Sequence, residues 1–475
     1  MIFIFLIIIY FSLLIGLGIF AHRHTKKTAE DYFLANRSFG PIILLFTLAA
    51  TNFSAFTFLG FAGNAYKTGF GQYGIMAFGT GFMAIMFFII GRKVWILGKE
   101  KKYITPPELI GDRFNSISLR VIFMSVMVIF TIPYLATQAI GAGIIIKNMA
   151  GIEMQVGAVI VMIIIMFYVL FGGMRASGWT DVIQGIIMIS ALTIAVVIIA
   201  VNLGGFEAAN IASYNANPSL FTRPGEGDFF LPQIWFSYMI LWLLADPMFP
   251  QIFSRFYTAK NQKSLKISMI LYPFLVSFLF LFPVLIGVWA HGAGINPDTN
   301  DNVLPLMVEK YASVVYPFVM IGALSALMST ADSQLLSLST MLSRDIPIKK
   351  KHFSDLISGK IIIVALTIFA IIYVVAGYDP SIGIMSTLVK TTFSGLAVLF
   401  PTTIAVLYWK KATKWGCIFS IILGEITIFL IQYNILPSFG FLSAIWGVLV
   451  AFIVLIFISY ITYNKNSNYF FTTAK

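Results

Sequence analysis

Long apolar stretches separated by short polar segments run along almost the whole chain. A bilayer core is about 30 Å thick, so a helix that crosses it needs about 20 mostly apolar residues. Such stretches are found at residues 1–20, 41–64, 72–94, 117–148, 154–172, 180–203, 231–253, 267–291, 304–343, 356–377, 381–408, 413–433 and 438–462. The ninth is too long for one crossing, so we expect its outer part, residues 302–313, to lie outside the bilayer. The pattern predicts an all-α polytopic membrane protein with about 13 transmembrane helices.

Two of these stretches are interrupted at corresponding places. The second contains Gly60-Phe-Ala-Gly63, and the seventh contains Ala245-Asp-Pro-Met-Phe-Pro250. Broken spans at matching positions of two halves are the sequence sign of an inverted-repeat transporter with its binding site at the breaks. We therefore expect a five-plus-five inverted-repeat core. The expected units are an extra helix and loop at 1–40, a first repeat at 41–203, a second repeat at 231–408, and two helices with a tail at 413–475.

The placement of positive charge predicts an orientation. Cytoplasmic loops of membrane proteins are rich in Lys and Arg, and most of the 31 Lys and Arg residues, Arg255 included, fall in every second polar segment. The first apolar stretch has no basic residue before it, and the cluster His22–Lys27 follows it, which is typical of a retained anchor rather than a signal peptide. We expect a multi-pass protein of the cell membrane with its N-terminus outside and its C-terminus in the cytoplasm.

Composition agrees with a protein whose main solvent is lipid. Hydrophobic residues make up 59% of the chain, charged residues only 11%, and the mean hydropathy is +0.91. The net charge of +12 follows from the topology and from anionic lipid head groups, so no nucleic-acid partner is expected. The single Cys417 excludes a disulfide framework and cofactors held by several thiolates.

Two stretches at membrane depth carry polar groups where a lipid-facing helix would carry leucine. Residues 47–64 read TLAATNFSAFTFLGFAGN, and residues 323–337 read ALSALMSTADSQLLS. Hydroxyl and carbonyl oxygens suit a hard cation, and a helix that unwinds within the membrane frees carbonyls to bind it. This pair of stretches indicates a transporter with a cation site.

Six motifs give the chain a specific resemblance. They are AEDYFLANR (29–37), AATNFSAFTFLGFAG (49–63), TPPELIGDRF (105–114), GGMRASGWTDVIQG (172–185), PQIFSRFYTAKNQKSLKIS (250–268) and ALMSTADSQLLSLSTMLSRDI (326–346). With these motifs in order, the chain resembles the sodium:solute symporter family, which includes proline, pantothenate, monocarboxylate, sialic acid and sodium/glucose transporters. The resemblance implies a leucine-transporter-type fold and Na⁺ as the coupling ion, with no other cofactor.

The resemblance also implies a sodium site between the second and ninth spans. Its oxygen ligands would be the carbonyls of Ala50, Phe53 and Ala326 and the hydroxyls of Ser329 and Thr330. The alternative is that the two hydroxyls only bond to carbonyls one turn back on their own helix, which is common in membrane helices.

The residues expected to bind the solute come from four spans. They are Asn52, Ser54, Thr57, Tyr134, Gln138, Trp242, Asp246 and Lys390. Asp246 departs from the proline-transporter pattern, and a carboxylate inside a broken span is costly unless it faces water, a cation or a substrate. Gln138 has the alternative role of bridging two helices.

Lys390 is the one basic residue deep within a predicted span, about ten residues or roughly 15 Å from its outer boundary. It would neutralise a substrate carboxylate, or pair with Asp246 or Glu425. Asp181 matches a family carboxylate associated with sodium coupling, and its alternative role is to cap a helix N-terminus.

These observations predict a secondary active symporter that couples inward Na⁺ flow to uptake of a small organic solute by alternating access. We lean toward a carboxylate-bearing solute: a monocarboxylate, an amino acid or pantothenate. The alternatives are a proton-coupled or passive solute carrier and a symporter-like membrane sensor. No pattern for an enzyme is found, since the four histidines have no metal-binding spacing. The partners expected are Na⁺, the solute and membrane lipid, and an oligomer is not required.

Overall fold

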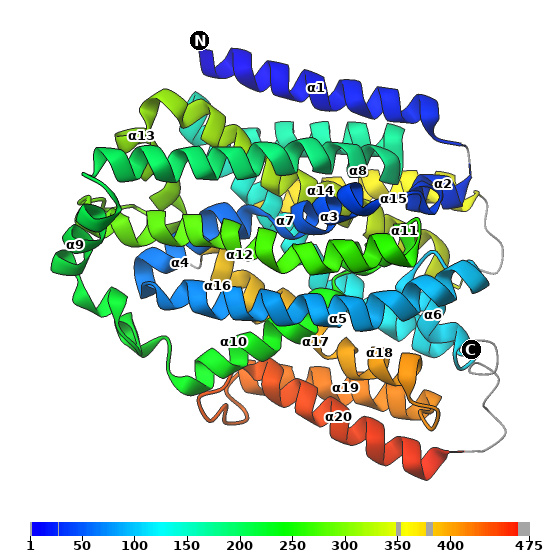
Figure 1. The fold of residues 1–475 in the computed structure, drawn as a ribbon. Coiled ribbons are helices and arrows are strands. Elements are labelled where there is room, and N and C mark those ends of the chain that lie inside the picture. Colours follow the sequence, from blue (N-terminus) through cyan, green and yellow to red (C-terminus); the bar gives the residue numbers. More distant parts are fainter. Residues whose placement is uncertain (1, 27, 348–352, 377–382, 464–475) are drawn as a thin grey trace.

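The computed structural model describes residues 2–26, 28–347, 353–376 and 383–463. In this part of the chain the regular structure is helical, apart from one isolated β-bridge between Phe39 and Ala259. The long helices run roughly along one axis and form a thick bundle, as expected for a protein that crosses a bilayer repeatedly (Figure 1).

The elements within the bundle follow the predicted stretches. They are α1 (Ile2–His24), α3 (Pro41–Asn52), η2 (Phe56–Gly60), α4 (Phe61–Thr68), α5 (Gly71–Lys101), α7 (Ile117–Ala150), α8 (Met154–Asn202), α10 (Pro232–Ala245), η5 (Asp246–Met248), α11 (Pro250–Thr258), α12 (Gln262–Gly292), α14 (Tyr316–Asp345), α15 (Asp355–Val375), α16 (Ile384–Leu388), η9 (Val389–Phe393), α17 (Ser394–Ala397), α18 (Leu399–Tyr408), α19 (Lys414–Gln432) and α20 (Ser443–Thr462). Shorter elements connect them: α2 (Ala29–Leu34), α6 (Pro106–Asp112), α9 (Phe206–Ala216), η6 (Asn300–Asn302) and α13 (Val303–Tyr311).

In the described residues, 10 helices are long and apolar enough to cross a membrane, or up to 11 if the bent pair formed by α3 and η2–α4 is one span. α8 has 49 residues, which is about 70 Å of helix and too long for one crossing. Gly173 interrupts it with φ 53° and ψ −146°. Asn148, just before α8, contacts Asn302, and Asn202 at its end contacts the carbonyl of Tyr311, so both ends of α8 lie at the same end of the bundle.

α8 is therefore long enough for two crossings, and α10, η5 and α11 together cover most of the seventh predicted stretch. Each of the thirteen predicted stretches then coincides with a helix, with half of α8 or with a run of consecutive helices. The outer part of the ninth stretch forms the separate helix α13, as expected. The predicted span ends at residues 377 and 381 lie outside the described residues.

Proline positions the second helix break. Pro247 and Pro250 occupy the first turns of η5 and α11, where a missing N–H leaves no intrahelical bond unmade. Between them Phe249 is extended, with φ −60° and ψ 127°. The sequence Ala245–Pro250 thus ends one helix and starts the next inside the membrane, as the sequence predicted.

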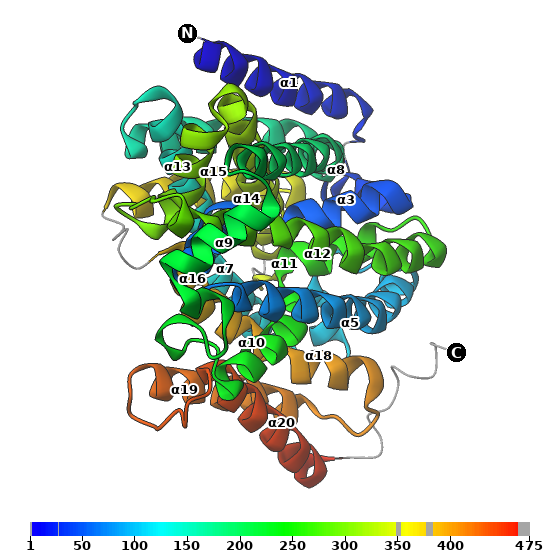
Figure 2. The same ribbon diagram turned by 60° about the vertical axis from the view of Figure 1, so that its left-hand side comes forward.

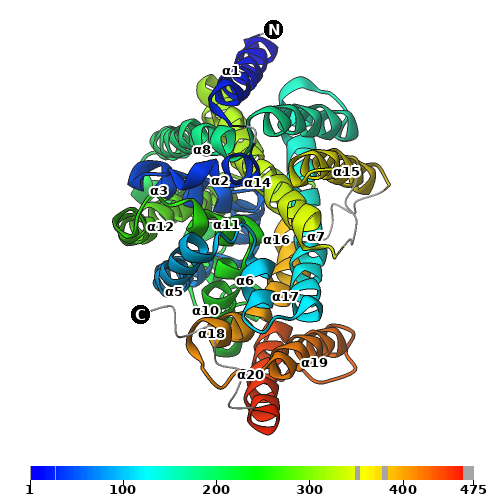
Figure 3. The same ribbon diagram turned by 90° about the vertical axis from the view of Figure 1, so that its right-hand side faces the viewer.

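The helices outside the core lie at opposite edges of the bundle. α1 packs on α8, whereas α19 and α20 pack on each other at the far edge, so the remaining helices lie between them (Figure 3). α1 starts at one end of the bundle and α20 finishes at the other, as an odd number of crossings requires (Figure 1). Figure 2 brings forward the end where α9 and α13 lie.

Asp301 connects η6 to α16 at this end of the bundle. Its carboxylate accepts a hydrogen bond from the backbone N–H of Ile384, at the start of α16, with an N···O distance of 3.1 Å. The side chain is buried in η6, and burial raises the pKa of Asp301 to about 6. Gly63 packs against the backbone of the neighbouring Asn300, where a Cβ atom would clash.

Replacing Asp301 by Asn should remove a pH dependence of stability. A carboxyl group with a pKa of about 6 when folded and 3.8 ordinarily binds its proton more tightly in the folded protein, so the free energy of unfolding falls as pH rises through this window. The difference is worth about 3 kcal/mol. The thermal midpoint of the purified protein, compared at about pH 5 and pH 7, should fall more in the wild type than in Asp301→Asn.

The exposed neighbour Asp298 gives a matched control, and Asp298→Asn should keep the wild-type response to pH. An unchanged response in Asp301→Asn would show that this carboxyl group is not the source.

Candidate functional site

The five predicted sodium ligands lie together between the break after α3 and the middle of α14. Ser329 Oγ lies 2.8 Å from the carbonyl oxygen of Ala50 and 2.9 Å from that of Ala326. Thr330 Oγ1 lies 2.8 Å from the carbonyl oxygen of Phe53. All five residues are buried. The arrangement collects five neutral oxygen atoms, a donor set that suits a hard monovalent cation.

The alternative role of these hydroxyls is only partly seen. Ser329 does approach Ala326 on its own helix, but it also reaches Ala50 across the interface. Thr330 approaches two carbonyls of the other helix, those of Thr51 and Phe53. The hydroxyls therefore connect α14 to the break rather than serving α14 alone.

Three of the predicted solute-binding residues complete the helix break itself. Ser54 Oγ accepts a hydrogen bond from the N–H of Phe56 at 3.2 Å, and Thr57 Oγ1 accepts one from the N–H of Ser54 at 3.3 Å. Gln138 Oε1 accepts a hydrogen bond from the N–H of Ala55 at 3.1 Å. A buried backbone N–H without a partner is costly, so these side chains make the unwound segment possible. Gln138 thus bridges α7 to the break.

Asn52 connects the five predicted sodium ligands, which we call the sodium cluster, to Asp246. Its side-chain amide donates to Asp246 Oδ2 at 2.9 Å and to the hydroxyl of Tyr272 at 2.7 Å. Asp246 is only 2% exposed and begins η5, in the second broken span. The two helix breaks therefore meet through this amide–carboxylate hydrogen bond.

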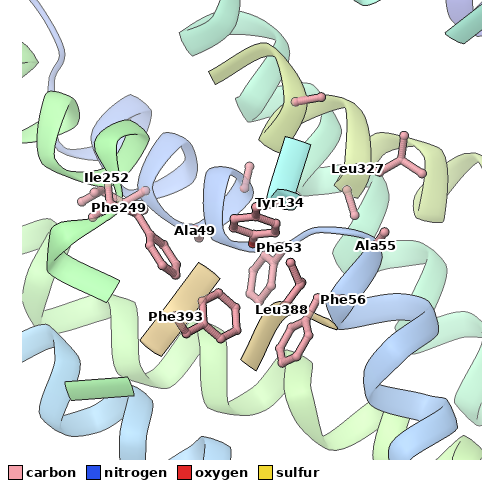
Figure 4. Close-up of a cluster of buried hydrophobic side chains, with 14 of the residues drawn as sticks. Ala49, Phe53, Ala55, Phe56, Tyr134, Phe249, Ile252, Leu327, Leu388 and Phe393 are labelled. Carbon is pink, nitrogen blue, oxygen red and sulfur yellow. The ribbon is translucent and has the colours of Figure 1, made fainter. Parts of the chain in front are cut away.

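Aromatic rings surround the same region. Phe393, from η9, lies within van der Waals reach of Trp242, Phe249, Phe56 and Tyr134, with ring-centroid distances of 4.9, 5.2, 5.8 and 5.8 Å. Figure 4 shows Phe393 between Phe249 and Phe56, with Tyr134 and Phe53 beside it. Trp242 Nε1 is buried and has no hydrogen-bond partner among the described residues. We call the rings of Phe56, Tyr134, Trp242, Phe249 and Phe393 the aromatic cluster.

A buried ionic network follows along α14 and α11. The Arg255 guanidinium is fully buried, with Nη2 3.5 Å from Asp181 Oδ2, and it donates hydrogen bonds to hydroxyl groups. The acceptors are the hydroxyl oxygens of Thr47, Thr51, Ser177 and Ser333. Asp332 accepts from Ser177 at 2.9 Å and from Tyr168 at 3.0 Å. One guanidinium thus faces two carboxylates through shared hydroxyl groups.

Asp181 lies in the interior of α8, after the interruption at Gly173, and is not at a helix N-terminus. Thr47 donates a hydrogen bond to its carboxylate, and Arg255 is its ionic partner. The geometry therefore agrees with an internal role for Asp181 and not with helix capping.

Lys390 is not brought to the other predicted residues. Its side chain is exposed, and its carbonyl accepts a hydrogen bond from Gln432, the last residue of α19. η9 is preceded by only five residues of α16, so Lys390 lies nearer the outer end than ten residues of helix would place it. No ion pair with Asp246 or Glu425 is found in the described part of the chain.

Sequence reasoning gave no role to Arg255, Asp332, Tyr272 and Phe393. Arg255 was counted among the loop charges that set the orientation, whereas it is buried in the bundle. Both stand within quoted motifs, Arg255 nine residues after Asp246 and Asp332 two residues after Thr330, and this closeness to expected site residues is the signal in the sequence. Tyr272 and Phe393 had none, because an aromatic residue in an apolar span is usually packing.

Removing Arg255 should destabilise the protein more than removing the charge of Asp181. Arg255→Met leaves two buried carboxylates without a cation, whereas Asp181→Asn leaves one carboxylate with one guanidinium. Breaking a buried ion pair costs about 3–5 kcal/mol, and we expect this range for Arg255→Met alone. Thermal midpoints in detergent measure the effect. Arg92→Met, at an exposed position, is the matched control, and equal losses in the two buried variants would contradict the charge count.

Comparisons with known proteins place this geometry in a family. The model of the sodium:solute symporter family matches residues 32–424. The sodium/pantothenate symporter of Haemophilus influenzae is 28% identical over 435 residues, covering 88% of this chain and 88% of that protein. The high-affinity proline transporter of Bacillus subtilis is 25% identical over 446 residues, covering 89% and 92%. These relatives are transporters and not enzymes.

Solved structures show the same fold. A Na⁺-coupled sialic acid symporter in a substrate-bound outward-open state superposes with a TM-score of 0.82 at 19% identity, covering 97% of this chain and 98% of that chain. A nucleobase-cation-symport-1 family transporter in a closed conformation gives 0.61 at 12% identity, covering 90% and 94%. The leucine-transporter-type fold expected from the motifs is thereby confirmed. With the family model matching most of its length, the chain belongs to the sodium:solute symporter family.

Proposed function

We propose that this protein couples inward flow of Na⁺ to uptake of a small organic solute across the cell membrane, with Na⁺ held by Ala50, Phe53, Ala326, Ser329 and Thr330. The observation that supports the ion site most directly is that these five oxygens, from helices nearly 280 residues apart, converge at the helix break. A cation there binds both elements at once, so its presence changes the relative stability of their arrangements.

The driving force is large enough for accumulation. One charge moving inward gains about 2.3 kcal/mol per 100 mV, which is close to a fifty-fold concentration ratio before the Na⁺ gradient is counted. In alternating access the loaded bundle moves about a fixed midplane site. Neutral oxygen ligands suit this cycle because Na⁺ can leave toward the cytoplasm without separating from a carboxylate.

The solute is proposed to bind beside the ion, at Asn52, Tyr134, Trp242 and Asp246. Ser54, Thr57 and Gln138 serve the same site by holding the helix break open. A carboxylate-bearing solute is favoured because pantothenate and proline, named for two relatives, both carry one. The exposed position of Lys390 gives it no part in this proposal.

Asp181 is proposed to act in coupling. Its network joins α3, α8, α11 and α14, which include both broken spans and the hydroxyl-bearing helix. A movement that opens the sodium cluster toward the cytoplasm must rearrange these hydrogen bonds. The two repeats, 41–203 and 231–408, would move about this interface, with the N-terminus outside and the C-terminus in the cytoplasm.

Uptake into proteoliposomes tests the proposal. We expect labelled proline, pantothenate or pyruvate to accumulate only with an inward Na⁺ gradient, and Ser329→Ala/Thr330→Ala to raise the Na⁺ concentration for half-maximal uptake at least about tenfold, since two of five ligands are lost.

Ser339→Ala/Thr340→Ala is the matched control. This second Ser–Thr pair lies on the same helix and is buried, and within the described part of the chain its hydroxyl groups bond to the carbonyl of Leu336 on their own helix. It should leave Na⁺ dependence unchanged. Uptake that persists without Na⁺ would favour a passive or proton-coupled carrier, and no uptake of any solute would favour a membrane sensor.

A further inference from the structure

Asp246 is a buried carboxylate without a cationic partner. Its hydrogen bond from Asn52 is a neutral one, and no ion pair to it is found among the described residues. Taking a carboxylate out of water costs several kcal/mol unless a cation and hydrogen bonds compensate it. An unpaired carboxylate at membrane depth therefore points to a cation that is not part of the chain.

The basic residues of the bundle do not supply this cation. Arg255 donates its hydrogen bonds to the network around Asp181, and Lys390 is exposed. The proposed sodium ligands on α3 and α14 do not include Asp246. The carboxylate is left for the solute.

The surroundings of Asp246 fit an organic cation. Trp242 lies one helical turn before it, and Phe249 lies three residues after it, so two rings of the aromatic cluster come from the same broken span as the carboxylate. Faces of Trp, Tyr and Phe rings attract ammonium groups, especially where water is excluded. A buried acid beside several rings is the chemistry that recognises a positively charged nitrogen.

The positions of the expected Na⁺ and of the Asp246 carboxylate also indicate how the solute is oriented. Asn52 hydrogen-bonds to Asp246, while its chain neighbours Thr51 and Phe53 present carbonyls to Thr330 in the sodium cluster. A bound Na⁺ would place a positive charge on one side of Asn52, and Asp246 places a negative charge on the other. A solute with a carboxylate toward Na⁺ and a cationic nitrogen toward Asp246 satisfies both.

We propose that the transported solute is a small zwitterion whose cationic nitrogen binds Asp246 against Trp242 and Tyr134, with its carboxylate directed to the sodium ion. This inference rests on the proposed symport and narrows its substrate class to amino acids and their N-alkylated forms. Monocarboxylates and pantothenate lack the cationic nitrogen, so they would leave Asp246 uncompensated.

The aromatic cluster must open to admit the solute. Phe393 fills the centre of the cluster in this structure, and it ends η9, a segment of π-helix. π-Helical turns within α-helices are frequent at functional sites. We expect the Phe393 ring to move aside and cover the solute's apolar part.

A solute panel on the wild type tests the substrate class. Labelled proline and glycine betaine carry both charges, choline carries only the cation, and pyruvate and pantothenate carry only the carboxylate. We expect Na⁺-driven uptake of a zwitterion, and little competition from the other three. Na⁺-driven uptake of pyruvate or pantothenate without uptake of a zwitterion would overturn the inference but leave symport intact. Uptake of choline alone would overturn the role given to the solute's own carboxylate, which choline lacks.

Asp246→Asn tests the contact itself. It keeps the shape and removes the charge, and the solute concentration for half-maximal uptake should rise at least about 30-fold, because truncating one partner of a buried charge pair costs 2–5 kcal/mol or more. Asp246→Glu should retain part of the affinity. Glu207→Gln, which removes one exposed negative charge, should change nothing.

A measurement of Na⁺ binding distinguishes failure of the Asp246 contact from failure of the proposed symport, on which this inference rests. Na⁺-induced thermal stabilisation should persist in Asp246→Asn, which also shows that the variant is folded. If Asp246→Asn transports a zwitterion with wild-type affinity, the contact is wrong although the symport stands. If Na⁺ neither stabilises the wild type nor drives any uptake, both proposals fail together.

Discussion

The unwound segment between α3 and η2 is the constraint on which the rest of the site depends. Breaking a helix inside a membrane leaves backbone groups that water cannot satisfy. Here Gln138 from α7 and the local hydroxyls of Ser54 and Thr57 bond to the freed N–H groups, while Ser329 and Thr330 from α14 approach the freed carbonyls. The unwound segment thus connects α3, α7 and α14, and its free carbonyls are the backbone oxygens available to a cation.

Buried charge is arranged in two contrasting ways on either side of this break. Arg255 is shared between Asp181 and Asp332 through serine and threonine hydroxyl groups, so that network is largely self-contained. Asp246 has a neutral amide and rings around it instead. A network whose charges already neutralise one another suits a coupling element that rearranges. A carboxylate without a cationic partner suits a ligand contact instead, because the free energy of ion pairing is gained only when a cationic ligand binds.

The predictions from the sequence agree best with the structure where the residues of one segment alone determine a helix or a helix break. The apolar stretches, the Pro247 and Pro250 break and the separate outer helix α13 follow from composition and backbone chemistry at the positions themselves. The exposure of Lys390 was not foreseen, because its span begins with a short helix and a π-helical turn, whose lengths a span-by-span count does not predict. Arg255 looked like a loop charge because an arginine just beyond an apolar stretch usually is one.

The sequence by itself determined that this chain is a membrane transporter of known family, that two of its spans are broken, and which hydroxyls and carbonyls lie together at the first break. Those properties are local, or are carried by motifs that keep their register. Only the tertiary structure decided what the buried charges face. Asp246 and Arg255 are nine residues apart in the chain, yet Asn52 and a set of rings surround the first, and Asp181 with four hydroxyls surrounds the second. Partners of this kind come from helices far apart in sequence, so packing alone assigns them.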